Sequence, residues 1–135
     1  MTEALTVAPT ILVADDEPDI VLLGCRRLRR AGYAVITATN GEEALREAID
    51  RQPDLALLDV MMPRLTGIEA ARAIRAAFAP RHLPVILMSA GLPDKVRVPW
   101  DADAFVTKPF VGQVLAETVR ELLDHDANAN AVALA

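Results

Sequence analysis

The chain contains the stretch Leu55-Ala56-Leu57-Leu58-Asp59, in which four consecutive apolar residues are followed by an acid. A strand that is apolar at every position is expected where helices cover both faces of a parallel sheet, because neither face then meets water. Asp59 would lie at the carboxyl end of this strand, where open parallel α/β sheets bind their ligands. The stretch therefore predicts a central strand of an α/β sheet with a functional carboxylate at its end.

Apolar runs of similar length recur along the chain and alternate with segments of helical periodicity, which is the pattern of repeated βαβ units. The helix after the first run is expected to start near Pro18 and to stop at Gly32. Asn40 and Glu43 have the spacing of a capping box that opens the next helix. We therefore predict a doubly wound α/β fold with a five-stranded parallel sheet and helices on both faces. The other predicted strands cover residues 11–14, 34–38, 84–88 and 104–107.

Length and composition restrict the class of protein. The 135 residues are enough for one domain, and a hydrophobic share of 53% with 24% charged residues excludes an intrinsically disordered chain. No apolar run approaches the roughly 18 residues of a membrane span, so no membrane insertion is expected. Fourteen basic and 19 acidic residues give a net charge of -5, which argues against direct nucleic-acid binding through phosphate neutralisation.

The start of the chain and its cysteine content bear on location. Residues 1–5 lack the positive charge of a secretory signal, and the single cysteine, Cys25, cannot form an internal disulfide. Both observations favour a cytoplasmic protein. We expect an N-terminal extension over residues 1–9, a folded domain over 10–123, and a disordered tail over 124–135, where the apolar periodicity is lost.

Five polar side chains lie at the ends of predicted strands. Asp15 and Asp16 follow the first strand, Asp59 ends the third, Ser89 closes the fourth and Lys108 follows the fifth. Because the carboxyl ends of parallel strands share one edge of a sheet, these side chains are expected to converge. Three carboxylates brought together repel one another unless a cation is supplied. Mg²⁺, which takes oxygen ligands, fits that set.

Lys108 and Ser89 add a second chemistry to this edge. A lysine ammonium and a serine hydroxyl are donors suited to holding a phosphoryl group rather than a metal ion. A carboxylate can itself accept a phosphoryl group and form a mixed anhydride. Asp59 on the central strand is the expected acceptor, since Asp15 and Asp16 would lie to one side as metal ligands.

The polar motifs match those of a known family in order and in context. Over about residues 10–123 the chain resembles the response regulator receiver domains of two-component signalling. The resemblance implies a flavodoxin-like fold of the chemotaxis-regulator type, with strand order 2-1-3-4-5. The matching segments are Asp15-Asp16, Asp59 to Pro63, Gly67, Ser89-Ala90 and Lys108-Pro109-Phe110.

The same resemblance implies a role for each site residue. Asp59 would receive a phosphoryl group from the phosphohistidine of a histidine kinase or phosphotransfer protein. Mg²⁺, or Mn²⁺ in its place, would be held by Asp16, Asp59 and the backbone carbonyl of Met61, with Asp15 helping through water. No other cofactor is expected.

Three further residues would respond to phosphorylation. Lys108 would pair with the phosphoryl oxygens, and its peptide bond to Pro109 would be cis. Ser89 would move to hydrogen-bond the phosphoryl group, and Phe105 would turn inward as a switch residue when that hydroxyl moves. The two packings would exchange as a population shift.

The chain departs from the family between Ser89 and Lys108, where it is shorter than usual. Pro93 and Pro99 leave little room for a helix, so the fourth helix is predicted to be a single turn or an irregular loop. Whether residues 90–103 change the output face of the domain stays open. The arginines at positions 26, 27, 29 and 30 favour a solvated helix face over a surface for docking a kinase.

These features predict a stand-alone receiver that signals to a separate protein partner or passes the phosphoryl group on as a phosphorelay intermediate. It would be a monomer or weak dimer, and no enzyme beyond its own phosphorylation and slow autodephosphorylation. One alternative is a pseudo-receiver that binds partners without phosphate. Another is a phosphohydrolase with an aspartyl intermediate, which is disfavoured because that chemistry generally places an acid two residues after the nucleophile, where this chain has Met61.

Overall fold

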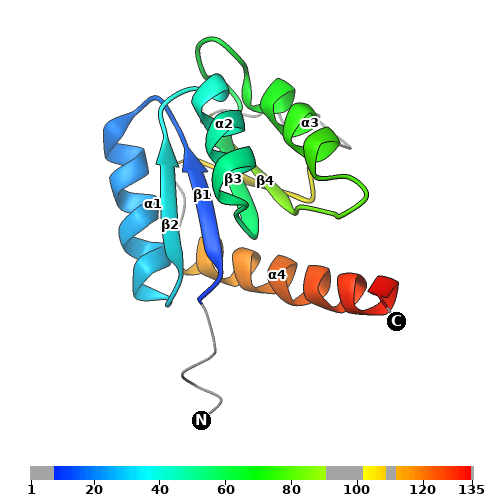
Figure 1. Cartoon of the computed structure of the whole chain (residues 1–135). Helices are drawn as coiled ribbons and strands as arrows, with labels where there is room; N and C mark the ends of the chain where they lie inside the picture. The colour runs from blue at the N-terminus through cyan, green and yellow to red at the C-terminus, as the bar shows by residue number, and fades with distance from the viewer. Residues whose placement is uncertain (1–7, 91–101, 109–111, 135) are drawn as a thin grey trace.

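The structure of the chain is a computed structural model, which describes residues 8–90, 102–108 and 112–134, with side chains described as far as His125. Strands and helices alternate from residue 10 to residue 89, as the apolar pattern predicts (Figure 1). The elements are β1 (Thr10–Ala14), α1 (Pro18–Arg30), β2 (Ala34–Ala38), α2 (Gly41–Arg51), β3 (Leu55–Asp59), α3 (Gly67–Phe78), β4 (Val85–Ser89), β5 (Ala104–Thr107) and α4 (Gly112–Leu134).

The five strands form one parallel sheet in the order β2-β1-β3-β4-β5, which confirms the predicted fold and strand order. β3 lies in the middle and is buried at all five positions, as its unbroken apolar sequence requires. The strand register aligns the carboxyl ends: Asp59 is opposite Met88, and Ser89 is opposite Thr107. The polar residues that end these strands therefore lie at one edge of the sheet.

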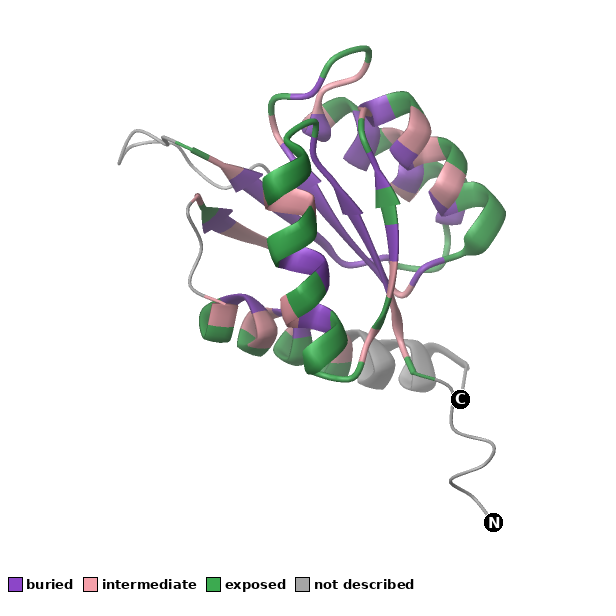
Figure 2. Ribbon diagram, turned by 90° about the vertical axis from the view of Figure 1, so that its left-hand side faces the viewer, coloured by how far each residue is buried: buried purple, intermediate pink, exposed green. Residues whose placement is uncertain are grey.

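Helices cover both faces of the sheet and enclose two apolar layers (Figures 1 and 2). On one face α2 and α3 pack through residues such as Ala48 and Ile74. On the other face α1 and α4 pack through Leu28, Leu115 and Val119. The buried strands between them, purple in Figure 2, have no solvent-facing side, which explains why they lack alternating polar residues.

Side chains fix the starts of α2 and α3. Asn40 Oδ1 accepts a hydrogen bond from the Glu43 backbone N–H at 2.8 Å. This is one of the two reciprocal hydrogen bonds of the predicted capping box. The complete capping box is at α3: Glu69 N–H donates to Thr66 Oγ1, and Thr66 N–H donates to Glu69 Oε1. This second box was not predicted, although its Thr-x-x-Glu spacing is visible in the sequence.

The structure corrects the prediction of a disordered tail over residues 124–135, because α4 continues to Leu134. Alanine is the best helix former, and a helix that has already nucleated extends at little cost even without an amphipathic face. The predicted short fourth helix falls on residues 91–101, which lie outside the described residues. The predicted cis bond before Pro109 lies outside them as well.

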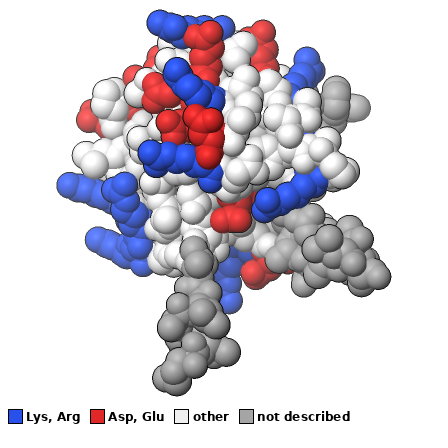
Figure 3. All heavy atoms as spheres, in the orientation of Figure 1, with Lys and Arg blue, Asp and Glu red and all other residues white. Residues whose placement is uncertain are grey.

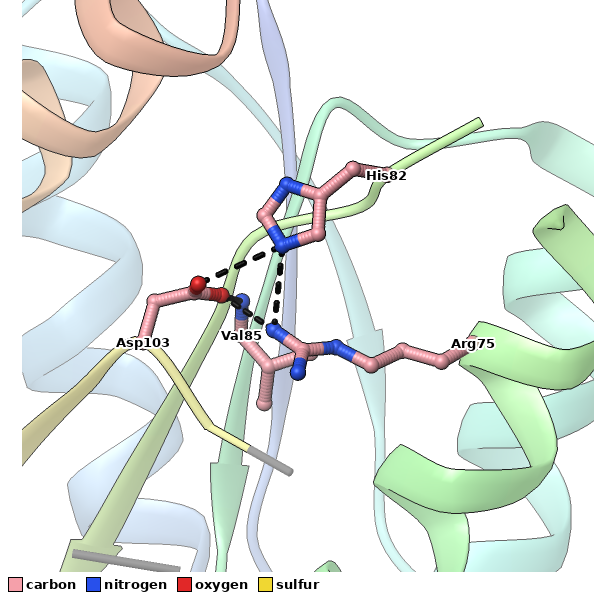
Figure 4. Close-up of polar contacts among 4 residues, drawn as sticks. All are labelled: Arg75, His82, Val85 and Asp103. Atoms are coloured by element: carbon pink, nitrogen blue, oxygen red, sulfur yellow. Dashed lines mark hydrogen bonds and ion pairs between the residues drawn. The ribbon is translucent and has the colours of Figure 1, made fainter. Parts of the chain in front are cut away.

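A polar cluster forms at the amino ends of β4 and β5, away from the carboxyl ends where Asp59 and Ser89 lie (Figure 4). The Asp103 carboxylate accepts hydrogen bonds from the Val85 backbone N–H at 2.8 Å and from the Arg75 guanidinium. His82 Nε2 lies 3.2 Å from Asp103 Oδ1 and 3.4 Å from Arg75 Nη2. The cluster therefore joins the end of α3 to the starts of β4 and β5.

The surface charges are unevenly spread. In Figure 3 basic side chains gather at the edge formed by α1, whereas acids and bases are interleaved over α2. On α1 itself, Arg26, Arg29 and Arg30 are exposed and Arg27 is half-buried. Among the helices that the structure describes, none is long and apolar enough to span a bilayer.

Candidate functional site

The candidate site is a pocket of 560 Å³ at the carboxyl edge of the sheet. Residues from the ends of four different strands, far apart in the sequence, line this pocket together. The structure thus places the predicted Asp16, Asp59, Met61, Ser89 and Lys108 at one pocket. The residues lining it are Asp16, Glu17, Asp59, Met61, Ser89, Ala90 and Lys108.

Lys108 is the electrostatic centre of the pocket. Its side chain is 6% exposed, and its Nζ atom lies 2.6 Å from Asp15 Oδ2 and 3.1 Å from Asp59 Oδ1. A third carboxylate, that of Glu17, lies 3.3 Å from the same nitrogen. One ammonium from the end of β5 therefore links the carboxylates that follow β1 and end β3.

For both Asp59 and Lys108, burial shifts the pKa in one direction and the contact with the oppositely charged partner shifts it in the other. Burial raises the pKa of Asp59, the contact with Lys108 lowers it, and the charge of Asp15 raises it, with a net rise. Burial by itself lowers the pKa of Lys108, but the contacts with Asp15 and Asp59 outweigh it and the pKa rises. Lys108 is therefore firmly cationic, while Asp59 holds a negative charge at a cost that an added cation would reduce.

The carboxylates that follow β1, beginning with Asp15, are a donor set that a cation fits. The side chain of Asp15 is fully buried, and its Oδ1 accepts the Glu17 backbone N–H at 2.9 Å. Its Oδ2 lies 2.6 Å from Lys108 Nζ, so a buried ammonium already balances the charge of this oxygen. One carboxylate oxygen from each of Asp15, Asp16 and Glu17 lies within 4.8 Å of the others, and such an all-oxygen set suits a hard divalent cation.

Glu17 belongs to this cluster, although no role was predicted for it from the sequence. The signal was present in the sequence, since Asp15, Asp16 and Glu17 are three consecutive acids directly after a strand. Only the first two were interpreted as ligands, because the resemblance supplied an acidic pair. The fold brings the third acid to both Lys108 and the other two carboxylates.

Gly67 sets the position of the backbone behind Asp59. Its N–H donates to the Val60 carbonyl at 2.9 Å, and a Cβ atom at this position would lie 2.1 Å from the Asp59 carbonyl oxygen. No side chain fits there without a backbone shift. Glycine therefore allows α3 to begin directly against the end of β3.

Ser89 and Phe105 lie on neighbouring strands and on the same face of the sheet. Phe105 is opposite Leu87, and Ser89 follows Leu87 by two residues, so both side chains share that face. Phe105 is half-buried and packs against the apolar layer that α2 and α3 cover. Met61, whose carbonyl is a predicted ligand, lines the pocket with its side chain 72% exposed.

The site therefore combines a buried carboxylate, a neighbouring ammonium, a hydroxyl residue and an acidic cluster in one open pocket. A phosphoryl group entering it would meet Asp59 as a nucleophile and Lys108 as a fixed positive charge. Phosphoryl transfer depends mainly on such positioning and charge neutralisation.

Comparisons with known proteins agree with this geometry. The model of the response regulator receiver domain family matches residues 11–120. The chain is 42% identical over 116 residues to the alkaline phosphatase synthesis transcriptional regulatory protein PhoP of Bacillus subtilis, which covers 84% of this chain and 48% of PhoP. The chain spans about half the length of the curated relatives it matches.

Solved structures give the same answer. The chemotaxis protein CheY4 of Vibrio cholerae superposes with a TM-score of 0.77 at 28% identity, over 85% of this chain and 98% of CheY4. NtrX of Brucella abortus, solved in complex with ADP, superposes with a TM-score of 0.85 at 30% identity, over 94% of this chain and 30% of NtrX. With its fold, its site and the match over residues 11–120, this chain belongs to the family of response regulator receiver domains.

Proposed function

We propose that this receiver accepts a phosphoryl group on Asp59 from the phosphohistidine of a histidine kinase or phosphotransfer protein. The observation that carries the proposal is the Lys108 ammonium, 3.1 Å from Asp59 Oδ1 inside an otherwise acidic pocket. A buried lysine at that distance supplies positive charge where a transferred phosphoryl group would bring negative charge.

In the proposed step an Asp59 carboxylate oxygen attacks the phosphorus atom. A P–O bond forms to Asp59 as the P–N bond breaks, and the leaving imidazole nitrogen takes the electron pair of that bond. Lys108 stays protonated and pairs with the phosphoryl oxygens. A bound Mg²⁺ or Mn²⁺, for which Asp15, Asp16, Asp59 and the Met61 carbonyl are the proposed ligands, would neutralise charge on the phosphoryl oxygens.

The response to phosphorylation would pass through the face that Ser89 and Phe105 share. The Ser89 hydroxyl would hydrogen-bond the phosphoryl group, and the space it leaves would favour an inward position of Phe105. Phe105 already packs against the apolar layer beneath α3, so a rotation there would alter the packing around β4 and β5. Such a change biases an equilibrium between two packings.

The output is proposed to be a protein contact in the cytoplasm. Two-component signalling or a phosphorelay would use it, with no direct nucleic-acid contact by the receiver and with a monomer or weak dimer as the active form. The stand-alone form stays a prediction, because the curated relatives are about twice as long. The size of the native protein, seen by immunoblot of its source cells, would decide it.

The acceptor role is tested by incubating the protein with acetyl phosphate and Mg²⁺ and measuring its intact mass. We expect an adduct of roughly 80 Da, the mass of one phosphoryl group, that is lost in Asp59→Ala and kept in Asp50→Ala. Asp50 is an exposed aspartate on α2 and serves as the matched control.

Two other outcomes would contradict the proposal. An unmodified mass under all conditions would support the pseudo-receiver. Rapid repeated release of inorganic phosphate would support the phosphohydrolase, whereas we propose that the chain has no turnover beyond slow loss of its own phosphoryl group.

A further inference from the structure

Glu17 places a carboxylate at the site that the proposed reaction does not use. Its side chain is 62% exposed, and it accepts a hydrogen bond from Lys108 Nζ at 3.3 Å. Glu17 precedes α1 as its N-cap residue, yet its side chain makes no capping hydrogen bond. The carboxylate therefore serves the pocket rather than the start of the helix.

Glu17 lies within reach of two different cations. One is the Lys108 ammonium. The other is a cation held by the acidic cluster, since a Glu17 oxygen lies within 4.8 Å of oxygens of Asp15 and Asp16. These donors are all carboxylate oxygens, which suit a hard divalent cation, whereas Asp15 Oδ2 already lies 2.6 Å from the Lys108 ammonium.

The three carboxylates around Lys108 differ in how readily they can leave it. Asp15 and Asp59 are buried, and separating a buried pair leaves an uncompensated charge in the protein. Glu17 is exposed and makes the longest of the three contacts, and exposed ion pairs contribute little. A phosphoryl oxygen that needs Lys108 would therefore displace Glu17 first.

Resting on the function proposed above, we propose that Glu17 is an exchangeable partner of Lys108. In the cation-free chain it holds the Lys108 ammonium over the pocket. When a cation binds beside Asp15 and Asp16, the Glu17 carboxylate turns to that cation, and a phosphoryl oxygen then takes its place at Lys108. Glu17 is thus a positioning residue for Lys108 and an additional ligand for the cation.

The first test measures cation affinity by calorimetric titration of Mg²⁺ into the full-length, unphosphorylated chain. Glu17→Gln is expected to raise the Mg²⁺ dissociation constant about three- to tenfold, as for the loss of a partly solvated charge next to the ion. The control is Asp19→Asn, which removes an exposed acid from the first turn of α1 outside the cluster. Its effect should stay below about twofold, since solvent and salt screen it.

The second test observes Lys108 directly, because the chain has only two lysines, Lys95 and Lys108. In the cation-free protein, the ¹⁵N NMR signal of Lys108 Nζ, assigned with Lys95→Arg, should shift in Glu17→Gln and stay in place in Asp19→Asn. With saturating Mg²⁺ and beryllofluoride, a phosphoryl mimic, the Lys108 signals of wild type and Glu17→Gln should converge.

Either of two results would overturn the proposal: an Mg²⁺ affinity that Glu17→Gln leaves unchanged, or a cation-free Lys108 signal that it leaves unchanged. Neither measurement needs phosphoryl transfer. A failure of Asp59 to accept a phosphoryl group would appear only in the intact-mass experiment, so the two failures are distinguishable.

Discussion

Asp59 combines two demands that oppose each other. As the proposed nucleophile it would have to be ionised, but it ends a strand that is buried at every position. Lys108 compensates part of the cost, yet burial and the charge of Asp15 still raise the pKa of Asp59 above its ordinary value. The residue is therefore placed for reactivity at some expense of stability.

Replacing Asp59 with Asn should accordingly stabilise the protein at neutral pH. Because its pKa is raised in the folded state, ionisation of Asp59 favours the unfolded chain as pH rises through the folded pKa. In chelator-treated protein, the Tm of Asp59→Asn should exceed that of wild type at pH 7, and the difference should shrink as pH falls toward 4. Asp50→Asn should show no such pH-dependent gain, and an equal gain there would contradict the explanation.

Gly67 supports Asp59 from behind by admitting α3 to the end of β3. Gly67→Ala should destabilise the protein by about 1–3 kcal/mol, the usual cost of overpacking, because its Cβ would meet the Asp59 backbone. Gly112→Ala is the matched control, since Gly112 also begins a helix but faces only the flexible side chain of Arg27. Urea unfolding should show the loss for the first variant alone.

At the scale of elements, local signals and packing act together. The N-terminal starts of α2 and α3 are fixed by capping side chains next to them in sequence, whereas packing against the sheet decides which faces of these helices are buried. The capping box at Thr66 matters for function because α3 starts only a few residues after Asp59. A helix that frays there would loosen the loop that lines the pocket.

Thr66→Ala should remove one capping hydrogen bond and cost about 0.5–2 kcal/mol of stability. Thr118→Ala is the control, because the Thr118 hydroxyl bonds to the Val114 carbonyl within α4 and caps nothing. Chemical denaturation monitored by circular dichroism would measure both. Equal losses in the two variants would argue against the capping role.

At the scale of the whole molecule, polar clusters lie at both ends of the strands: the candidate site at the carboxyl ends, called the first edge, and the Asp103 cluster at the amino ends, called the second edge. Lys108 joins β1, β3 and β5 at the first edge, and the Asp103 cluster joins α3, β4 and β5 at the second. β5, one of the two edge strands of the sheet, is thus held by polar contacts at both of its ends. This arrangement fixes the strand that carries Phe105 and precedes Lys108.

Asp103→Ala should therefore destabilise the protein by about 1–3 kcal/mol, because the Val85 N–H and the Arg75 guanidinium lose their acceptor. Arg81→Ala, which removes a 3.8 Å ion pair with Asp54 between exposed side chains, should cost at most about 0.5 kcal/mol. Thermal unfolding would compare the two. A loss at Arg81 as large as that at Asp103 would contradict the structural role of the second edge.

The sequence by itself determined the fold class, the strands and the strand-end residues. A short, wholly apolar run between amphipathic helices avoids water only as a strand that helices cover on both faces. Asp59 and Lys108 could be predicted as neighbours for the same reason, since both lie at carboxyl ends of parallel strands. The continuation of α4 was missed, because the loss of amphipathic period was interpreted as disorder although the segment is rich in alanine.

Only the tertiary structure decided which groups touch. The contact of Glu17 with Lys108 and the Asp103 cluster depend on distances between segments far apart in the chain. The close approach of Gly67 to Asp59 depends on how tightly α3 packs against the end of β3. Periodicity records which face of an element is buried, but it carries no information about which polar group lies opposite. Those contacts follow from the strand order and register, and they determine the charges and hydrogen bonds of the site.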